Sequence, residues 1–107
     1  MTSQGHPRTA FRRALEHGNL VLAEVTAREI GHVELAEALE LTALIALHDA
    51  ERGQRAALRW LQRWLAETPD VTIGAISLAS GCLRELGGVH HHRALAALRG
   101  CCSVSPR

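Results

Sequence analysis

The stretch from residue 41 to residue 47 (LTALIAL) is the most apolar helical segment of this 107-residue chain, and it constrains the fold more than any other feature. Successive side chains of a helix turn by about 100°, so the Leu, Ile and Ala side chains here point in nearly every direction around the axis. A helix that is apolar all round must be covered on several sides. We therefore predict a central helix over residues 33–48 that other helices enclose.

Start and stop signals predict six helices in all. Good N-cap residues stand before four of them: Thr9, Asn19, Asp49 and Asp70. Gly53 is expected to interrupt the helical structure between the third and fourth helices. The predicted helices span residues 10–17, 20–30, 33–48, 55–67, 71–86 and 90–98. Residues 9–100 would then form one all-α domain of antiparallel helical hairpins, between a flexible arm at 1–8 and a flexible tail at 101–107.

The predicted helix over residues 55–67 is the most amphipathic one. Trp60 and Trp64 lie one turn apart on its apolar side, so we expect both indoles to be buried against the central helix. A basic stripe runs along the other side: Arg52, Arg55, Arg59 and Arg63. Four guanidinium groups on one face can bind phosphates or a carboxylate-rich partner. The alternative is a solvated face, or pairing with an acidic strip on the central helix: Glu34, Glu37 and Glu40.

The predicted breaks within hairpins recur every 34 or 35 positions, at Gly18-Asn19, Gly53 and Gly87-Gly88. A period of this length resembles that of tetratricopeptide repeats, with units at about 9–30, 32–67 and 71–99. The middle unit matches best, because four residues stand where that family keeps a small residue, two core residues and a closing proline: Ala57, Leu61, Leu65 and Pro69. The signature of the family's first helix is missing. A plain six-helix bundle is the alternative.

Composition limits the class of protein. Hydrophobic residues make up 47% of the chain, enough for a core, and no apolar run approaches the ~20 residues that span a bilayer. Residues 1–8 lack the apolar stretch of a secretory signal, so we expect a cytoplasmic protein that does not associate with a membrane. All twelve basic residues are arginine, which is typical of a GC-rich, bacterial gene. Three cysteines without C-x-x-C spacing imply no disulfide framework.

Charge is unevenly distributed although the formal net charge is only +1. Residues 16–51 hold eight acidic residues and one basic residue, whereas residues 52–107 hold eight arginines and three acidic residues. The two halves can face each other and neutralise, or the second half can present a basic face to an anionic partner. We favour neutralisation, because the excess is small for a nucleic-acid binder.

No residue pattern predicts catalysis or a bound metal. The run His90-His91-His92 with Cys101-Cys102 offers metal-binding side chains. Neighbouring helical side chains point about 100° apart, however, so three consecutive histidines cannot all reach one ion unless the segment is unwound. We interpret the histidines as an exposed helix start, and the acidic strip as solvated or paired rather than catalytic. We expect no cofactor and no enzymatic activity.

These patterns favour a non-enzymatic helical module that binds another protein or itself. A homodimer is plausible, because a short array leaves apolar end helices uncapped; the expected self-association surface is Ile73, Ile76 and Leu83. The alternative is a nucleic-acid-binding domain that uses the Arg52, Arg55, Arg59 and Arg63 face.

Overall fold

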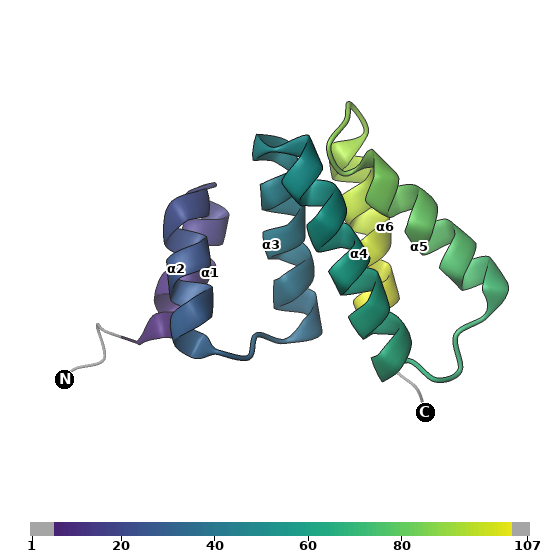
Figure 1. The fold of residues 1–107 in the computed structure, drawn as a ribbon, viewed down its shortest axis with the longest axis horizontal. Helices are drawn as coiled ribbons and strands as arrows, with labels where there is room; N and C mark the ends of the chain where they lie inside the picture. The colour runs from purple at the N-terminus through teal and green to yellow at the C-terminus, as the bar shows by residue number, and fades with distance from the viewer. Residues whose placement is uncertain (1–5, 104–107) are drawn as a thin grey trace.

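The computed structural model describes residues 6–103, which form six α-helices and no strand. The helices are α1 (Pro7–Glu16), α2 (Leu20–Ile30), α3 (Leu35–His48), α4 (Ala50–Glu67), α5 (Ile73–Glu85) and α6 (His91–Ser103). They form three hairpins, α1–α2, α3–α4 and α5–α6, that lie side by side (Figure 1). The shortest extent of the molecule is 20 Å, about two helix diameters, so the helices form two layers. The predicted all-α class is confirmed.

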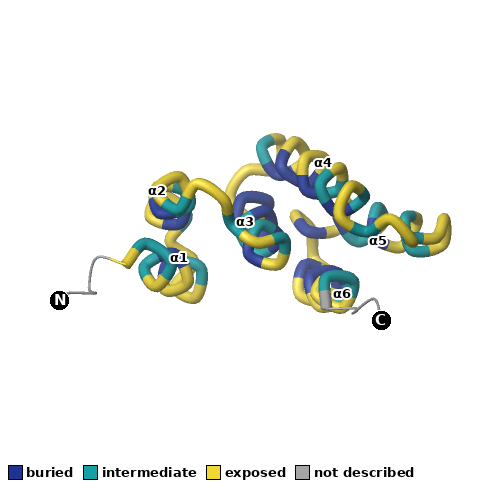
Figure 2. The backbone as a smooth tube through the Cα atoms, turned by 90° about the horizontal axis from the view of Figure 1, so that it is seen from below, coloured by how far each residue is buried: buried dark blue, intermediate teal, exposed yellow. Residues whose placement is uncertain are grey.

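Helix α3 is the centre of this arrangement. It contacts both helices of the first hairpin, its own partner α4, and α6 of the third hairpin. Buried residues therefore occur on several sides of it (Figure 2): Leu39, Thr42, Ala43, Leu44, Ile45 and Ala46. The prediction of an enclosed helix is confirmed except in the last turn, where Leu47 is 54% exposed.

The larger core cluster joins the second and third hairpins through two stacked indoles. Trp60 and Trp64 are 2% and 3% exposed, their rings lie 5.9 Å apart, and their planes differ by 9°. Trp60 Nε1 donates a hydrogen bond of 3.0 Å to the carbonyl oxygen of Leu35. Trp64 Nε1 is buried and has no hydrogen-bond partner within the described part of the chain. Burial of both indoles is confirmed, and Trp60 ties α4 to the start of α3.

The first hairpin is attached to α3 by a smaller apolar cluster and by ion pairs. Phe11, Ala14 and Ala23 are buried there together with Leu44. Glu37, which is 8% exposed, accepts a hydrogen bond from Arg8, and Arg12 Nε lies 3.5 Å from its second carboxylate oxygen. Glu37 also completes a capping box with Glu34 at the start of α3.

Glu37 makes the stability of the fold depend on pH. Burial acts to raise the pKa of Glu37, but the hydrogen bonds from Arg8 and the Glu34 backbone and the nearby arginine charges outweigh it, so the pKa lies below its ordinary value. A lowered pKa stabilises the fold above the ordinary carboxyl value of about 4.3, and this contribution is lost as pH falls through the folded-state pKa. We expect Glu37→Gln to cost about 1–2 kcal/mol at neutral pH and to flatten the fall in stability between about pH 5 and pH 3.

Urea unfolding followed by circular dichroism across this pH range measures both effects. Glu29→Gln is the control, because Glu29 is exposed on α2. Parallel pH profiles for the wild type and Glu37→Gln would contradict the assignment.

Five of the six predicted helix starts differ from the structure; α3 begins at Leu35 rather than residue 33, and α6 at His91 rather than residue 90. Helix α1 begins at Pro7 rather than residue 10, because proline is favourable at the first helical position, so Thr9 is not its cap. Residues 7–8 therefore belong to the domain; residues 1–5 of the predicted arm lie outside the described residues. Helix α4 begins at Ala50, capped by Asp49, which places Gly53 inside the helix instead of in a break. Helix α5 is capped by Thr72 rather than by Asp70.

The predicted tail is also wrong at its start. Helix α6 continues through Gly100 to Ser103, and Cys101 and Cys102 pack against the larger core cluster. This packing offsets the roughly 1 kcal/mol that a glycine costs within a helix. Burial raises the pKa of the Cys102 thiol to about 11, so this thiol stays protonated at neutral pH. Residues 104–107 lie outside the described residues.

Candidate anion-binding groove

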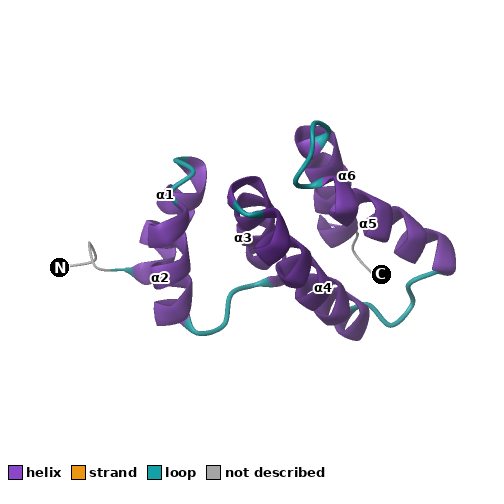
Figure 3. Cartoon of the chain, turned by 45° about the horizontal axis from the view of Figure 1, so that its top comes forward, coloured by secondary structure: helices purple, strands orange, loops and turns teal. Residues whose placement is uncertain are grey.

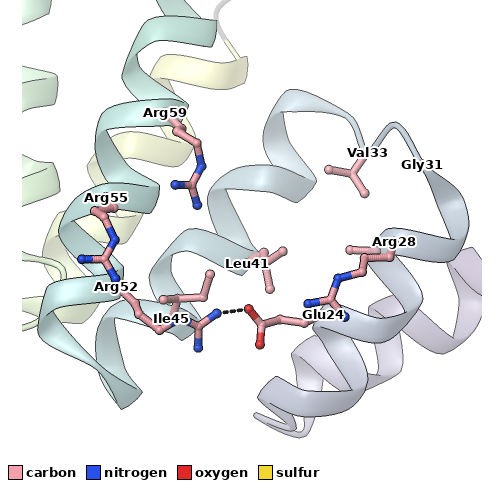
Figure 4. Close-up of a pocket in the computed structure, with 10 residues that line it drawn as sticks. Glu24, Arg28, Gly31, Val33, Leu41, Ile45, Arg52, Arg55 and Arg59 are labelled. Carbon is pink, nitrogen blue, oxygen red and sulfur yellow. Dashed lines mark hydrogen bonds and ion pairs between the residues drawn. The ribbon is translucent and has the colours of Figure 1, made fainter.

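A groove of about 350 Å³ opens between the first and second hairpins (Figure 4). Helices α2 and α4 form its walls, and α3 with the loop that precedes it forms its floor. We call it the arginine groove and define it by its lining residues: Glu24, Ala27, Arg28, Gly31, Val33, Leu41, Ile45, Arg52, Arg55 and Arg59.

The α4 wall supplies three arginines of the predicted basic stripe. Arg52, Arg55 and Arg59 recur at spacings of three and four, which keeps them on one helix face. That face lies outward because Trp60 and Trp64 hold the opposite face in the core. The fourth member, Arg63, is not in the groove.

Arg63 instead makes local contacts. Its Nε donates a hydrogen bond of 2.7 Å to Glu67, and its Nη2 lies 3.3 Å from His32 Nε2. Two glutamates of the central helix, which were considered as partners for the basic stripe, instead pair with other arginines. Glu37 pairs with arginines of α1, and Glu40 accepts two hydrogen bonds, of 2.7 and 2.8 Å, from Arg99 of α6.

The α2 wall contributes Arg28 and Glu24, one turn apart on the same face. Arg28 was not among the predicted site residues. It is the single basic residue between positions 16 and 51, which was a usable signal. Its place opposite α4, however, depends on how the first hairpin packs on α3, which the local sequence does not specify.

One arginine of the groove is paired and three are not. Arg52 forms an ion pair with Glu24 across the groove. Within residues 6–103, the structure shows no ion pair for Arg28, Arg55 or Arg59. The lining therefore carries four positive charges and one negative charge, and it attracts anions.

The floor of the groove is apolar. Val33, Leu41 and Ile45 line it, and guanidinium groups stand on both walls (Figure 4). An apolar floor excludes water and strengthens the hydrogen bonds that the guanidinium groups can form with a carboxylate or phosphate. The arrangement fits a ligand that combines negative charge with apolar surface.

The aromatic residues bear on which anion could bind. The chain has three, Phe11, Trp60 and Trp64, and all are at most 3% exposed. Proteins that bind single-stranded nucleic acids stack bases on exposed aromatic side chains. None of the residues that line the groove is aromatic, so the groove lacks this means of holding bases.

For two other groups of residues, the exposure in the structure differs from the predicted exposure. One residue of the predicted self-association surface, Leu83, is buried in the larger core cluster at 8% exposure. Ile73 is 81% exposed and Ile76 is partly buried. The histidine run is not a uniformly exposed helix start, because His91 is buried, with Nδ1 2.6 Å from the Leu86 carbonyl oxygen. Among the described residues, no group of three His, Cys, Asp or Glu side chains is arranged to hold a metal ion.

Comparisons of the chain with protein-family models, with curated proteins and with solved structures gave no significant match. The fold itself defines the class: an all-α protein of three helical hairpins with an arginine-lined groove between the first two. Across residues 6–103, no helix has the length and apolarity needed to cross a bilayer.

Proposed function

We propose that this protein is a non-enzymatic, tetratricopeptide-like helical module that binds a partner protein in the arginine groove. The observation that carries the proposal is the set of three arginines, Arg28, Arg55 and Arg59, that stand without an ion-pair partner in the described structure above an apolar floor. A charged rim around an apolar centre is typical of protein–protein interfaces, in which arginine is enriched.

Nucleic-acid binding is the second candidate, and the basic stripe on α4 favours it. The buried aromatic residues and the apolar floor favour a protein partner instead. Three available arginines also supply few phosphate contacts compared with the six to ten that are common in duplex binding. A homodimer through α5 is a further form of protein binding, supported by the exposed side chains of Ile73 and Leu78.

Charge reversal in the groove tests the proposal. The tagged wild type and an Arg55→Glu/Arg59→Glu variant are used to capture proteins from the native cell, and captured proteins are quantified by mass spectrometry. We expect at least one protein to fall about tenfold or more in the variant, and the purified pair to reproduce this loss. Arg84→Glu/Arg93→Glu is the matched control, because it makes the same charge change on α5 and α6, outside the groove.

Two results would contradict the proposal. One is equal recovery of every captured protein by the wild type and the groove variant, with circular dichroism showing that both are folded. The other is a captured nucleic acid whose binding is lost in the groove variant while no protein is affected.

A further inference from the structure

We propose that the occupant of the arginine groove is an acidic, partly apolar segment of a partner protein, and that one of its carboxylates displaces Glu24 from Arg52. This inference rests on the proposed function. It adds the chemistry of the partner and identifies a competitor within the chain itself.

Glu24 shows that the groove already holds a carboxylate. It projects from the α2 wall and meets the Arg52 guanidinium across the groove (Figure 4). The side chains of Glu24 and Arg52 are 22% and 41% exposed, so a ligand in the groove could reach the pair. In the unbound protein Glu24 neutralises one of the four arginines, and a ligand carboxylate must compete with it.

The spacing of the other arginines indicates the pattern of the partner. Arg55 and Arg59 are four residues apart on α4, about 6 Å along the helix axis. Carboxylates four residues apart on a helix have this separation, and those two apart on an extended segment have nearly the same. Arg28 lies on the opposite wall, so carboxylates on both edges of the ligand would be bound.

The floor specifies the rest of the ligand. Val33, Leu41 and Ile45 provide no side-chain hydrogen-bond donor or acceptor, so an apolar side chain between the carboxylates is the complement of this surface. A segment that alternates glutamates with leucines meets both requirements. A sugar–phosphate chain would place polar groups on the apolar floor, at a cost in desolvation.

Synthetic peptides test this directly. The probe is a fluorescein-labelled helical peptide of about four turns, with glutamates four residues apart and leucines between them. Reference peptides carry Gln for Glu or Ser for Leu, and single-stranded RNA of similar net charge is measured beside them. Fluorescence anisotropy at low salt should show the Glu–Leu peptide binding about tenfold or more tightly than each reference peptide and more tightly than the RNA.

Variants of the protein locate the binding. Arg28→Gln and Arg59→Gln should each weaken binding about three- to tenfold, whereas Arg93→Gln on α6 should leave it within about twofold. Glu24→Gln should strengthen it about threefold or more, because Arg52 becomes available, and Glu29→Gln should not. The gain should disappear in Glu24→Gln/Arg52→Gln, and thermal unfolding of each variant checks that it is folded.

Equal binding of the Glu and Gln peptides, or tighter binding of the RNA, would overturn the acidic-segment proposal. Unchanged or weaker binding in folded Glu24→Gln would overturn the role of Glu24 as a competitor. Failure here is distinguishable from failure of the proposed function. If a protein is captured in a way that depends on Arg55 and Arg59, but the peptide does not bind, only this inference fails and the proposed function stands. If neither capture nor peptide binding depends on the groove, the proposed function fails as well.

Discussion

Trp60→Ala is expected to lower the free energy of unfolding by about 3–5 kcal/mol, a large share of the ~5–15 kcal/mol by which domains are stable. The indole is 2% exposed in the cluster that joins the second and third hairpins, and its Nε1 holds the Leu35 carbonyl at the start of α3. Truncation leaves a cavity, removes this hydrogen bond and breaks the stack with Trp64. Urea unfolding followed by circular dichroism measures the loss.

Leu58→Ala on the same helix is the control, with an expected loss of less than about 1 kcal/mol because Leu58 is 57% exposed. Replacement by phenylalanine distinguishes the two indoles. Trp60→Phe should cost about 1–2 kcal/mol more than Trp64→Phe, because only Trp60 Nε1 has a hydrogen-bond partner in the described structure. Equal losses for Trp60→Ala and Leu58→Ala would show that the indole is not a core residue.

Gly53→Val is expected to cost about 3 kcal/mol or more, because this glycine of α4 packs directly against Ala46 of α3. A Cβ atom at Gly53 would lie 2.6 Å from Ala46 Cα and 2.8 Å from Ala46 Cβ, so the α3 backbone would have to move. Gly53→Ala should also be destabilising, by about 1–2 kcal/mol, although alanine is the better helix former.

Gly81 provides the matched control for this prediction, because it also lies within a helix. Apart from its own stretch of helix, no atom of residues 6–103 lies within 4 Å of where its Cβ would be. Gly81→Ala should therefore stabilise the protein by about 0.5–1 kcal/mol. Thermal unfolding compares the two; a Gly53→Ala variant more stable than the wild type would contradict the close approach.

The sequence predicted the parts of the fold that depend on local periodicity. The apolar residues from 41 to 47 required an enclosed helix, and the pair Trp60 and Trp64 required a buried face on the next helix. Asn19 and Asp49 cap helices as expected, because their side chains can accept hydrogen bonds from nearby backbone N–H groups whatever the tertiary structure. Three stripe arginines line the groove because they share a helix face.

The wrong predictions at Gly53 and Gly100, and the omission of Arg28 from the site, concern residues whose role depends on tertiary contacts. Gly53 has the composition of a turn, but it lies inside α4 because Ala46 of α3 leaves room for a hydrogen atom only. Gly100 resembles a helix end, but contacts of Cys101 and Cys102 with the core extend α6 beyond it. Arg28 lines the groove because the first hairpin packs on α3, partly through the long-range pairing of Arg8 with Glu37. No local pattern encodes these contacts.

The claim that the arginine groove is the binding site is tested most directly by NMR. The changes in amide chemical shift are measured while the Glu–Leu peptide is added. At 11.6 kDa the protein suits two-dimensional NMR. We predict that the largest shifts fall in residues 24–33, 41–45 and 52–59, and that they shrink in Arg55→Glu/Arg59→Glu. The claim would be contradicted if the largest shifts were concentrated on α5 and α6. It would also be contradicted if no shifts were seen at peptide concentrations that saturate the anisotropy signal.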